Sequence, residues 1–478
     1  MERVTLLSIV SIFLCSHAQL PSAKPLTWIS ESSPSCWTSI RIPLPGRLTS
    51  CYEDGTCRCS NKSGTADCSS NEGRLTFVPY LPGEFRTLNF SHNKLSEISD
   101  DDFFVNVSIG LRVLDLYNNG LTYIVHGAFA RFTHLETLLL GGNQLKWPEV
   151  AAVLAIPSLS DLDVKCNELG HIPTDAFAGV SNRSQLRALD LSINNIDSLD
   201  MKELRPLRRL HYLDIWHNEV RVLRAARLTS LMAFKLNVNR LFHFLNSCEA
   251  GGEKSFFPSL RHLNFEYNSV SELQEPTFLP NLTVFTLRYN KIMYFKANMF
   301  STSRFPALNH LNVAFSEARI QEIKGFTFNN SAVTKVDFSM NRVNFSDVSL
   351  VDEDMFGGCT NLTDLILTSN KFQTVSAERF RRLFRPISSS LKTLHLGKCG
   401  IEHVCRQFFA DLPHLSYLYL FENALTHLPD GTFDTLGKLQ FLNLDSNRIA
   451  MISSETFTSE TRYRLYIVVC LFLFIYLF

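Results

Sequence analysis

One pattern of apolar and polar positions recurs along most of the chain. Its form is L-x-x-L-x-L-x-x-N-x-L, with other apolar residues replacing leucine in some copies. A clear copy runs from Leu111 to Leu121, and the copies extend from Phe85 to Ile449. Self-similarity at a period of roughly 20–50 residues indicates a stacked repeat, in which each unit buries its apolar face against its neighbours.

Alignment on the asparagine position gives fifteen copies, spaced by 21 to 29 residues. Thirteen copies keep the asparagine, so we expect it to satisfy backbone groups where the chain leaves a strand. The other two positions are Ser316 and Cys399, and we expect Cys399 to be a buried free thiol. The asparagines are Asn93, Asn119, Asn143, Asn167, Asn194, Asn218, Asn239, Asn268, Asn290, Asn341, Asn370, Asn423 and Asn447.

The x-L-x-L-x segment of each copy predicts a short strand that buries its leucines and exposes the alternate positions. Stacked copies predict an α/β-type repeat, a horseshoe-shaped solenoid with a parallel sheet on its concave face. Three longer spacings mark insertions, of which one is residues 245–255 and the others precede Asn370 and Cys399. Such insertions are either binding elements or inert loops.

The chain contains 38 phenylalanines, and many recur ten residues after the asparagine position. A residue at a fixed offset occupies the same place in every coil, so these side chains predict an aromatic spine inside the convex side. The predicted members are Phe103, Phe129, Phe177, Phe278, Phe300, Phe326, Phe380, Phe409, Phe433 and Phe457.

Four cysteines, Cys51, Cys57, Cys59 and Cys68, stand just before the first repeat. A terminal repeat must cover its apolar edge, and a small disulfide-stapled unit does so. Four cysteines also suit a zinc site, which we disfavour because the chain carries signs of secretion. The remaining cysteines of the mature region, Cys36, Cys166, Cys248, Cys359 and Cys405 beside Cys399, have no assigned partners, although a Cys399–Cys405 bridge is conceivable.

The cysteine cap and the phenylalanine-bearing repeats resemble the extracellular leucine-rich repeat superfamily, and most of all a Toll-like receptor ectodomain, over about residues 36–457. The resemblance implies the pairings Cys51–Cys59 and Cys57–Cys68. The sequence departs from it after Asn447, where neither a cysteine-rich cap nor an intracellular signalling domain follows. We therefore expect the last repeat to leave apolar surface bare unless another chain covers it.

Residues 1–18 are predicted to be a secretory signal peptide, because an apolar run precedes the small-residue site Ser16-His17-Ala18. Eight Asn-x-Ser/Thr sequons support secretion and predict glycosylation. The chain should then be secreted or reach the cell surface. The sequons lie at Asn61, Asn89, Asn106, Asn182, Asn281, Asn329, Asn344 and Asn361.

The predicted regions are the signal peptide, a linker and cap over 19–84, the solenoid over 85–457, and a polar spacer with an apolar tail over 458–478. Leu465 to Phe478 carries no charge but is short for a membrane helix. Three interpretations stay open: a glycolipid-anchor signal with attachment at Ser453 or Ser454, a short membrane tail, or a truncated gene model.

The charge balance and the absence of catalytic motifs limit the classes of function that the sequence supports. Lys plus Arg and Asp plus Glu both number 46, so no net positive charge favours nucleic acid. The chain lacks a nucleophile elbow, a zinc-protease helix and a phosphate loop, so we expect neither an enzyme nor a cofactor. Thirteen histidines remain after signal removal, and their charging in an acidic compartment would make nucleic acid a less favoured but open partner class.

Large aromatic and charged residues on predicted concave strand positions are the candidate ligand-binding site, because Trp, Tyr and Arg are enriched in binding hot spots. The alternative is that a wide sheet merely tolerates exposed aromatic residues, which then have no role in binding. A second cluster, Lys398, Tyr417, Tyr419, Phe421 and Phe441, is more simply explained by packing near the end of the solenoid. The candidates are Tyr212, Asp214, Trp216, His217, His262, Glu266, Tyr267, Arg288, Tyr289, His310 and Phe315.

One strand position is occupied by aspartate in four repeats, at Asp115, Asp163, Asp190 and Asp214, and we disfavour a cation site there. Asn89 occupies this position in the first repeat, so a glycan on it would obstruct the first-repeat end of the concave face.

The predicted function is a ligand-recognition module of innate immunity that binds microbial or endogenous ligands. It is capable of pairing with a second leucine-rich repeat receptor and lacks its own signalling domain. The alternatives are a cell-surface adhesion or matrix protein and a glycolipid-anchored decoy or co-receptor.

Overall fold

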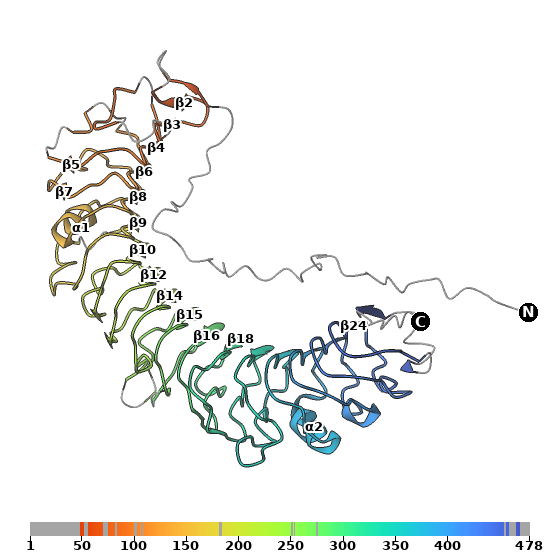
Figure 1. Cartoon of the computed structure of the whole chain (residues 1–478). Coiled ribbons are helices and arrows are strands. Elements are labelled where there is room, and N and C mark those ends of the chain that lie inside the picture. The colour runs from red at the N-terminus through yellow and green to blue at the C-terminus, as the bar shows by residue number, and fades with distance from the viewer. Residues whose placement is uncertain are drawn as a thin grey trace, which may run out of the picture. The chain divides into compact units, whose positions relative to one another are not determined.

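The computed structural model describes residues 48–51, 56–69, 75–81, 84–99, 103–105, 107, 109–180, 184–249, 252, 254–273, 276–453, 456–457 and 465–468. The chain divides into two compact units. We call the one that ends with Asn268 and includes Gln274–Thr277 the N-terminal unit, and the one made of Ser269–Leu273 and Phe278 onward the C-terminal unit. Each is a stack of repeats with its main strands side by side (Figure 1).

The N-terminal unit contains a parallel sheet with one strand from each repeat. Neighbouring strands pair in register, so that Leu114, Leu138 and Leu162 lie beside one another and are buried. The strands are β4 (Thr87–Asn89), β6 (Val113–Asp115), β8 (Thr137–Leu139), β9 (Asp161–Asp163), β10 (Ala188–Asp190), β12 (Tyr212–Asp214), β14 (Ala233–Lys235) and β15 (His262–Asn264).

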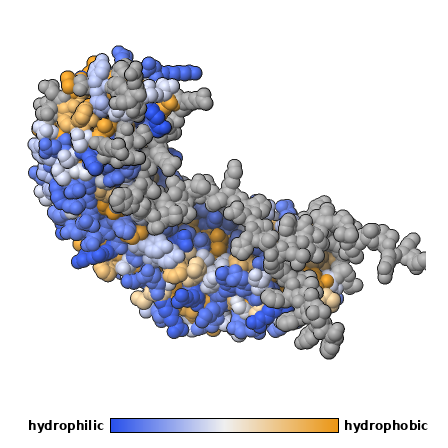
Figure 2. Space-filling model, turned by 45° about the horizontal axis from the view of Figure 1, so that its top comes forward, coloured by the Kyte–Doolittle hydropathy of each residue, from blue (hydrophilic) through white to orange (hydrophobic). Residues whose placement is uncertain are grey.

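The C-terminal unit repeats this arrangement, with Leu365, Leu394 and Leu418 buried side by side. Its strands are β16 (Val284–Thr286), β18 (His310–Asn312), β20 (Lys335–Asp337), β21 (Asp364–Ile366), β22 (Thr393–His395), β23 (Tyr417–Tyr419), β24 (Phe441–Asn443) and β25 (Tyr466–Val468). The two units confirm the predicted solenoid of about fifteen repeats. In the view of Figure 2, hydrophilic side chains cover most of the coloured surface and apolar residues form scattered patches, because the leucines are inside.

The repeat asparagines form a hydrogen-bonded ladder that ties each repeat to its neighbour. The Nδ2 group of Asn143 donates to the carbonyls of Leu140 (2.8 Å) and, one repeat back, Leu116 (3.1 Å). Its Oδ1 accepts from the amides of Asn119 and Leu121, both at 2.9 Å. The asparagine is therefore structural, as predicted. At the exception Cys399, the buried thiol donates to the carbonyl of Gly397 at 3.3 Å, which confirms the predicted free thiol and leaves no bridge to Cys405.

The residue before the asparagine position has a left-handed backbone in all fifteen repeats. It is glycine only at Gly142, and the other copies include bulky residues such as Val238, Tyr289 and Phe315. A left-handed conformation costs a non-glycine residue roughly 1–2 kcal/mol, so the ladder must hold each turn closed. The repeat pattern predicts that the chain leaves the strand here, but it does not predict the left-handed backbone.

The aromatic spine is present, with three of its predicted members displaced. Phe300, Phe328 and Phe356 stack with centroid separations of 5.6 and 5.5 Å, and all three are fully buried. Phe326, the predicted member, is 47% exposed. In the first repeat, Phe104 is buried in the spine instead of Phe103, which is half-buried. Phe278 is also only half-buried. A fixed offset fails where the connection after the strand contains an extra residue or two, because the next phenylalanine then reaches the core.

The cap is built as the resemblance implied. Cys51 pairs with Cys59 and Cys57 with Cys68, which confirms both disulfides. Strands β1 (Thr49–Ser50), β2 (Arg58–Ser60) and β3 (Thr65–Asp67) are antiparallel, and β3 then pairs in parallel with β4. The cap therefore covers the first repeat by extending its sheet. Cys166 is also disulfide-bonded, with a partner outside the described residues.

The connections on the side away from the sheet carry the other elements (Figure 1). Helix α1 (Trp147–Leu154) lies in the N-terminal unit, and the insertion before Cys399 forms α2 (Ala377–Phe384) and the 3₁₀ helix η1 (Arg385–Ile387). Buried Arg379 of α2 donates to the carbonyl of Val351 at 2.8 Å and thereby fastens the insertion before Asn370. The smaller elements are β5 (Glu97–Ile98) paired with β7 (Tyr123–Ile124), β11 (Ser198–Asp200) with β13 (Val222–Arg224), β17 (Tyr294–Phe295) with β19 (Glu322–Ile323), and the 3₁₀ helix η2 (Arg406–Phe408).

The last repeat is not left bare, contrary to expectation. Strand β25, which falls inside the predicted apolar tail, pairs in parallel with β24, and Phe457 stacks on Phe433 at 5.5 Å. Leucine-like periodicity at Leu465 and Ile467 lets this segment act as a further repeat strand. Ser453 lies in a loop, whereas Ser454, the signal peptide, Asn106 and Asn182 fall outside the described residues. No helix within the described ranges is long and apolar enough to cross a membrane.

Candidate ligand-binding face

The strand face is the side of each sheet opposite the buried leucines. Each repeat contributes four outward positions: the first and third strand residues, the second residue after the strand, and the left-handed turn residue that follows it. All eleven predicted binding residues occupy one of these positions. Seven belong to the N-terminal unit and four to the C-terminal unit, so they form two groups.

In the N-terminal unit, β12 carries a polar cluster. The Tyr212 hydroxyl donates to Oδ2 of Asp214 at 2.8 Å, and Lys235 of β14 pairs with the same carboxylate at 3.2 Å. The Lys235 ammonium also lies 5.5 Å from the centre of the Tyr212 ring. Beside this cluster, the rings of Trp216 and exposed His217 are 5.1 Å apart. The cluster is already internally paired, whereas the Trp216–His217 pair presents ring surface.

The neighbouring β15 repeat contributes His262, Glu266 and Tyr267 to the same face. Tyr267 sits at the left-handed turn and is 46% exposed. Burial, with a smaller effect of Arg261, lowers the pKa of His262 below its usual value. The amide of Glu266 donates to Oδ1 of Asn264 at 3.0 Å. Tyr267 is therefore the exposed aromatic side chain of this repeat.

In the C-terminal unit, three predicted residues form one stack. The Tyr289 and Phe315 rings are 4.3 Å apart, and the Arg288 guanidinium lies 5.3 Å from the Tyr289 centroid. Arg288 is half-buried and no carboxylate among the described residues pairs with it. His310 is on the adjacent strand β18, where burial, followed by Lys335, lowers its pKa. The stack joins a cation and two aromatic rings on one surface.

The second predicted cluster is largely committed to internal packing. The Phe441 ring contacts Tyr419 at 5.1 Å and stacks on Tyr466 of β25 at 5.8 Å. The Phe421 ring lies over Gly397, where an added Cβ would approach it to 2.4 Å. Lys398 pairs with Glu422 at 3.0 Å. Tyr417 stays 41% exposed, so only the edge of this cluster is accessible.

The shared aspartate position is explained by a turn. Oδ1 of Asp115 accepts from the amide two residues on, Tyr117, at 2.9 Å. Asp163, Asp190 and Asp214 make the same bond, and so do asparagines at the equivalent position, such as Asn264. Within the described part of the chain, no group of three or more metal-ligating side chains is placed to hold a metal ion. The carboxylates therefore close turns at strand ends.

Burial makes these carboxylates sensitive to pH. It raises the pKa of Asp115 to about 7, and repulsion from Asp163 and Asp67 adds to the rise. Burial and the neighbouring Asp214 and Asp163 raise the pKa of Asp190 to about 8. The folded protein therefore binds more protons than the unfolded chain between about pH 4 and these values, so the free energy of unfolding falls as pH increases through that window.

We predict that Asp115→Asn raises the free energy of unfolding at pH 8 by about 1–3 kcal/mol and leaves it unchanged at pH 4. Asparagine keeps the turn bond, as Asn264 shows, but is never charged. Thermal unfolding at pH 4, 6 and 8 measures the effect. Asp200→Asn is the control, since Asp200 makes the same turn bond to Lys202 from a more exposed site. An equal gain at pH 4 and pH 8 would contradict titration as the cause.

Histidine protonation gives little support to acid-induced nucleic-acid binding on this face. Burial, with Lys335, lowers the pKa of His395 to about 4, and its ring stacks on Tyr419 at 3.9 Å. The pKa values of His262 and His310 are lowered as well. These three strand-face histidines therefore gain charge only below the pH of an ordinary histidine, which weakens the predicted switch.

The predicted glycosylation sites differ in accessibility. Asn61, Asn281 and Asn361 are exposed, and Asn89, Asn329 and Asn344 are half-buried. Asn89 lies on strand β4 at the strand face, where its Oδ1 accepts from the Ser91 amide at 3.0 Å. Glycan attachment stays a prediction at all eight sequons.

Comparisons with known proteins also identify leucine-rich repeats in this chain. A leucine rich repeat family model matches residues 84–145, 157–220 and 389–449, and a model of the BspA type leucine rich repeat region matches residues 281–388. Together the matches take in more than half of the chain. They fall on the repeats whose strands and ladder asparagines are described above.

Curated relatives include adenylate cyclase of Schizosaccharomyces pombe, at 26% identity over 84% of this chain and 22% of the cyclase. Podocan of Mus musculus is 25% identical over 79% of this chain and 66% of podocan. CD180 antigen of Mus musculus is 24% identical over 88% of this chain and 66% of CD180. The chain thus spans about a fifth of the cyclase and slightly under two thirds of the other two.

Among solved structures, the TLR13-ssRNA13 complex matches with a TM-score of 0.45 and 21% identity, over 87% of this chain and 67% of that one. The repeat pattern, the asparagine ladder, the cysteine cap and the two family models all point to one family. The chain belongs to the leucine-rich repeat family, and CD180 antigen is among its relatives.

Proposed function

We propose that this protein is the ligand-recognition part of an innate-immune surface receptor and binds a microbial or endogenous ligand on the strand face. The observation that carries the proposal is the Arg288–Tyr289–Phe315 stack. A cation without a carboxylate partner beside two stacked rings is a typical composition of a binding hot spot. The similarity to CD180 antigen supports a receptor of this class.

The proposal includes partners and location. The protein is secreted or displayed at the cell surface, as relatives such as lumican, podocan and CD180 antigen are. It recognises a protein or microbial ligand and pairs with a copy of itself or with another leucine-rich repeat receptor.

A matrix or adhesion protein is the second candidate function, because podocan and lumican match at 25% and 28% identity. In that case the same face binds a host protein, and the chain acts as a decoy, co-receptor or adhesion module. The surface chemistry alone suits both classes, since aromatic and arginine side chains bind host and microbial proteins equally well.

We predict that the double variant Tyr289→Ala/Phe315→Ala weakens ligand binding at least tenfold. Surface plasmon resonance on the immobilised full chain would compare fractionated microbial extracts with fractionated extracellular matrix. Phe242→Ala is the control, since Phe242 is 55% exposed but lies outside the strand face. Saturable binding of microbial fractions supports the receptor class, and binding of matrix fractions alone favours the second candidate. Equal binding by both variants would contradict the strand face as the site.

A further inference from the structure

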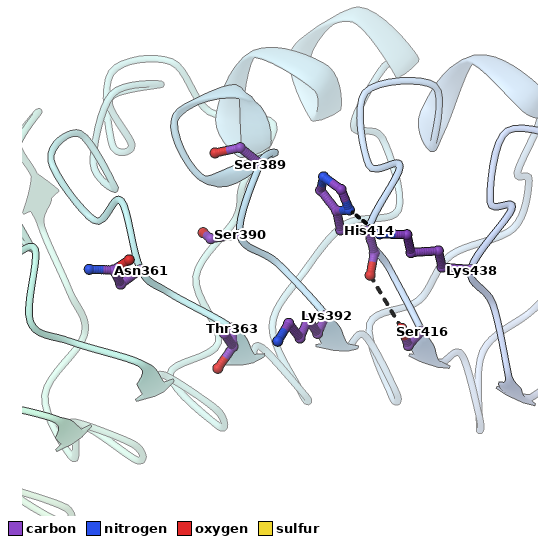
Figure 3. A pocket seen from close by; sticks show the side chains of 8 residues that line it. All are labelled: Asn361, Thr363, Ser389, Ser390, Lys392, His414, Ser416 and Lys438. Carbon is purple, nitrogen blue, oxygen red and sulfur yellow. Dashed lines mark hydrogen bonds between the residues drawn. The ribbon is translucent and has the colours of Figure 1, made fainter.

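A polar groove lies beside α2, away from the strand face. It consists of two adjoining pockets, of about 310 and 710 Å³, that share Ser389 and His414. The smaller pocket is lined by residues that lead into neighbouring strands, among them Thr363, Lys392 and Ser416 (Figure 3). The larger one is lined by α2 and by the segment around Asp411. All these residues belong to the C-terminal unit, so the groove is formed within one compact stack of repeats.

Cations without carboxylate partners mark this groove. Arg381 and Arg382 are neutralised, the former by Asp411 at 2.8 Å and the latter by Glu378. Arg385, Lys392 and Lys438, by contrast, have no carboxylate within ion-pair distance among the described residues. The Lys438 ammonium instead lies 2.9 Å from Nδ1 of His414. The groove therefore carries positive charge in a chain whose net charge is zero.

The remaining lining is rich in hydroxyl groups. The Ser390 hydroxyl donates to the carbonyl of Leu362 at 2.8 Å, and the Ser416 hydroxyl donates to the carbonyl of His414 at 3.3 Å. Their oxygens keep lone pairs that accept hydrogen bonds from a ligand. No aromatic side chain other than the imidazole of His414 lines either pocket. The groove thus offers cations and hydroxyl oxygens along its length, but no platform for stacking.

We propose that this groove binds a sulfated saccharide chain of the glycosaminoglycan type. Sulfate groups would pair with Arg385, Lys392 and Lys438, and sugar hydroxyls would donate to the serine oxygens. A single-stranded nucleic acid fits less well, because such sites stack bases on aromatic side chains. Two joined pockets suit several sugar units better than one isolated anion. This site is distinct from the strand face and holds whether or not the proposed receptor function does.

One glycosylation sequon lies at the groove and affects how saccharide binding must be measured. Asn361, which is exposed, lines the smaller pocket together with Thr363, the hydroxyl residue of the same sequon. A glycan attached there would start at the wall of the groove. Binding is therefore measured in both the native protein and the Asn361→Gln variant, which removes any such glycan while leaving the cations in place.

The experiment is isothermal titration of the full secreted chain with a heparin octasaccharide, an N-acetylated and desulfated octasaccharide, and an oligo-dT of similar length. We predict saturable binding of the sulfated octasaccharide alone. The variant Arg385→Gln/Lys392→Gln/Lys438→Gln should weaken it at least tenfold, and Lys392→Gln alone should weaken it severalfold. The control Arg319→Gln/Lys371→Gln/Arg406→Gln removes the same charge from exposed cations outside the groove and should change affinity less than twofold.

Four outcomes would overturn the proposal: no binding of the sulfated octasaccharide, equal loss in both triple variants, oligo-dT binding that the groove variant abolishes, or binding only after Asn361→Gln. The second would indicate non-specific charge attraction, the third a nucleic-acid groove, and the fourth a groove occupied by the protein's own glycan. Far-ultraviolet circular dichroism and the unfolding temperature verify that each variant is folded. If the groove triple variant unfolds, Lys392→Gln alone decides.

Discussion

Asn143→Ala is expected to lower the free energy of unfolding by about 3–5 kcal/mol. Asn143 is 5% exposed, and its side chain donates to three carbonyls and accepts from two amides. Alanine leaves the Leu116 carbonyl and the two amides buried without this partner, and each orphaned group costs about 1–3 kcal/mol before relaxation. The Leu140 carbonyl keeps a hydrogen bond from the side chain of Asn167. Since the ladder joins neighbouring repeats, the loss should be concentrated near Asn143.

Two measurements check this expectation. Equilibrium unfolding in denaturant gives the change in stability, and native-state hydrogen exchange gives its location. Protection should fall at Asn119 and Leu121, whose amides donate to Asn143, more than in the C-terminal unit. Gln144→Ala is the matched control, because Gln144 is exposed and adjacent in sequence. A loss below about 1 kcal/mol for Asn143→Ala would show that water replaces the ladder bonds.

Phe328→Ala should cost about 3–5 kcal/mol, because it opens a cavity inside the aromatic spine. Phe328 is fully buried, stacks between Phe300 and Phe356, and meets Phe338 edge-on at 6.0 Å. Its neighbours come from different coils and cannot all close on the vacancy. Phe326→Ala should cost less than about 1 kcal/mol, since that side chain is 47% exposed.

The pair of variants also decides between two assignments of the spine. Counting ten residues from the asparagine position selects Phe326, whereas the structure selects Phe328. Both variants would be compared by denaturant unfolding, with Phe328→Leu to test whether a smaller apolar group restores part of the loss. A larger effect for Phe326→Ala than for Phe328→Ala would place the wrong phenylalanine in the core.

The two proposed sites, the strand face and the groove beside α2, are positioned by different parts of the repeats. The strand-face residues Tyr289 and Phe315 stand at left-handed turns, so the ladder that stabilises the repeat also fixes the direction in which these side chains point. The groove beside α2 depends instead on the inserted segment that forms α2 and η1, between the ladder positions Asn370 and Cys399. Variation in insertion length can therefore alter the groove without disturbing the sheet.

Much of the fold was predictable because the repeat constrains it fifteen times over. Leu114, Asn143 and the other repeat residues each face one environment in every coil, so their pattern alone indicates strand, core and ladder. The cap disulfides followed from the family resemblance and were confirmed. The candidate binding residues lie on the predicted outward positions, since alternation along a strand determines its two faces.

Tertiary structure decided what the pattern leaves unspecified. Left-handed turns at residues as bulky as Phe315 exist only because ladder bonds from neighbouring repeats offset their local cost. Phe328 rather than Phe326 enters the spine because loop length, not sequence offset, sets which ring reaches the core. The stack of Arg288, Tyr289 and Phe315 and the unpaired cations of the groove arise from residues of separate coils. The sequence by itself determined each coil, and contacts between coils determined which side chains meet.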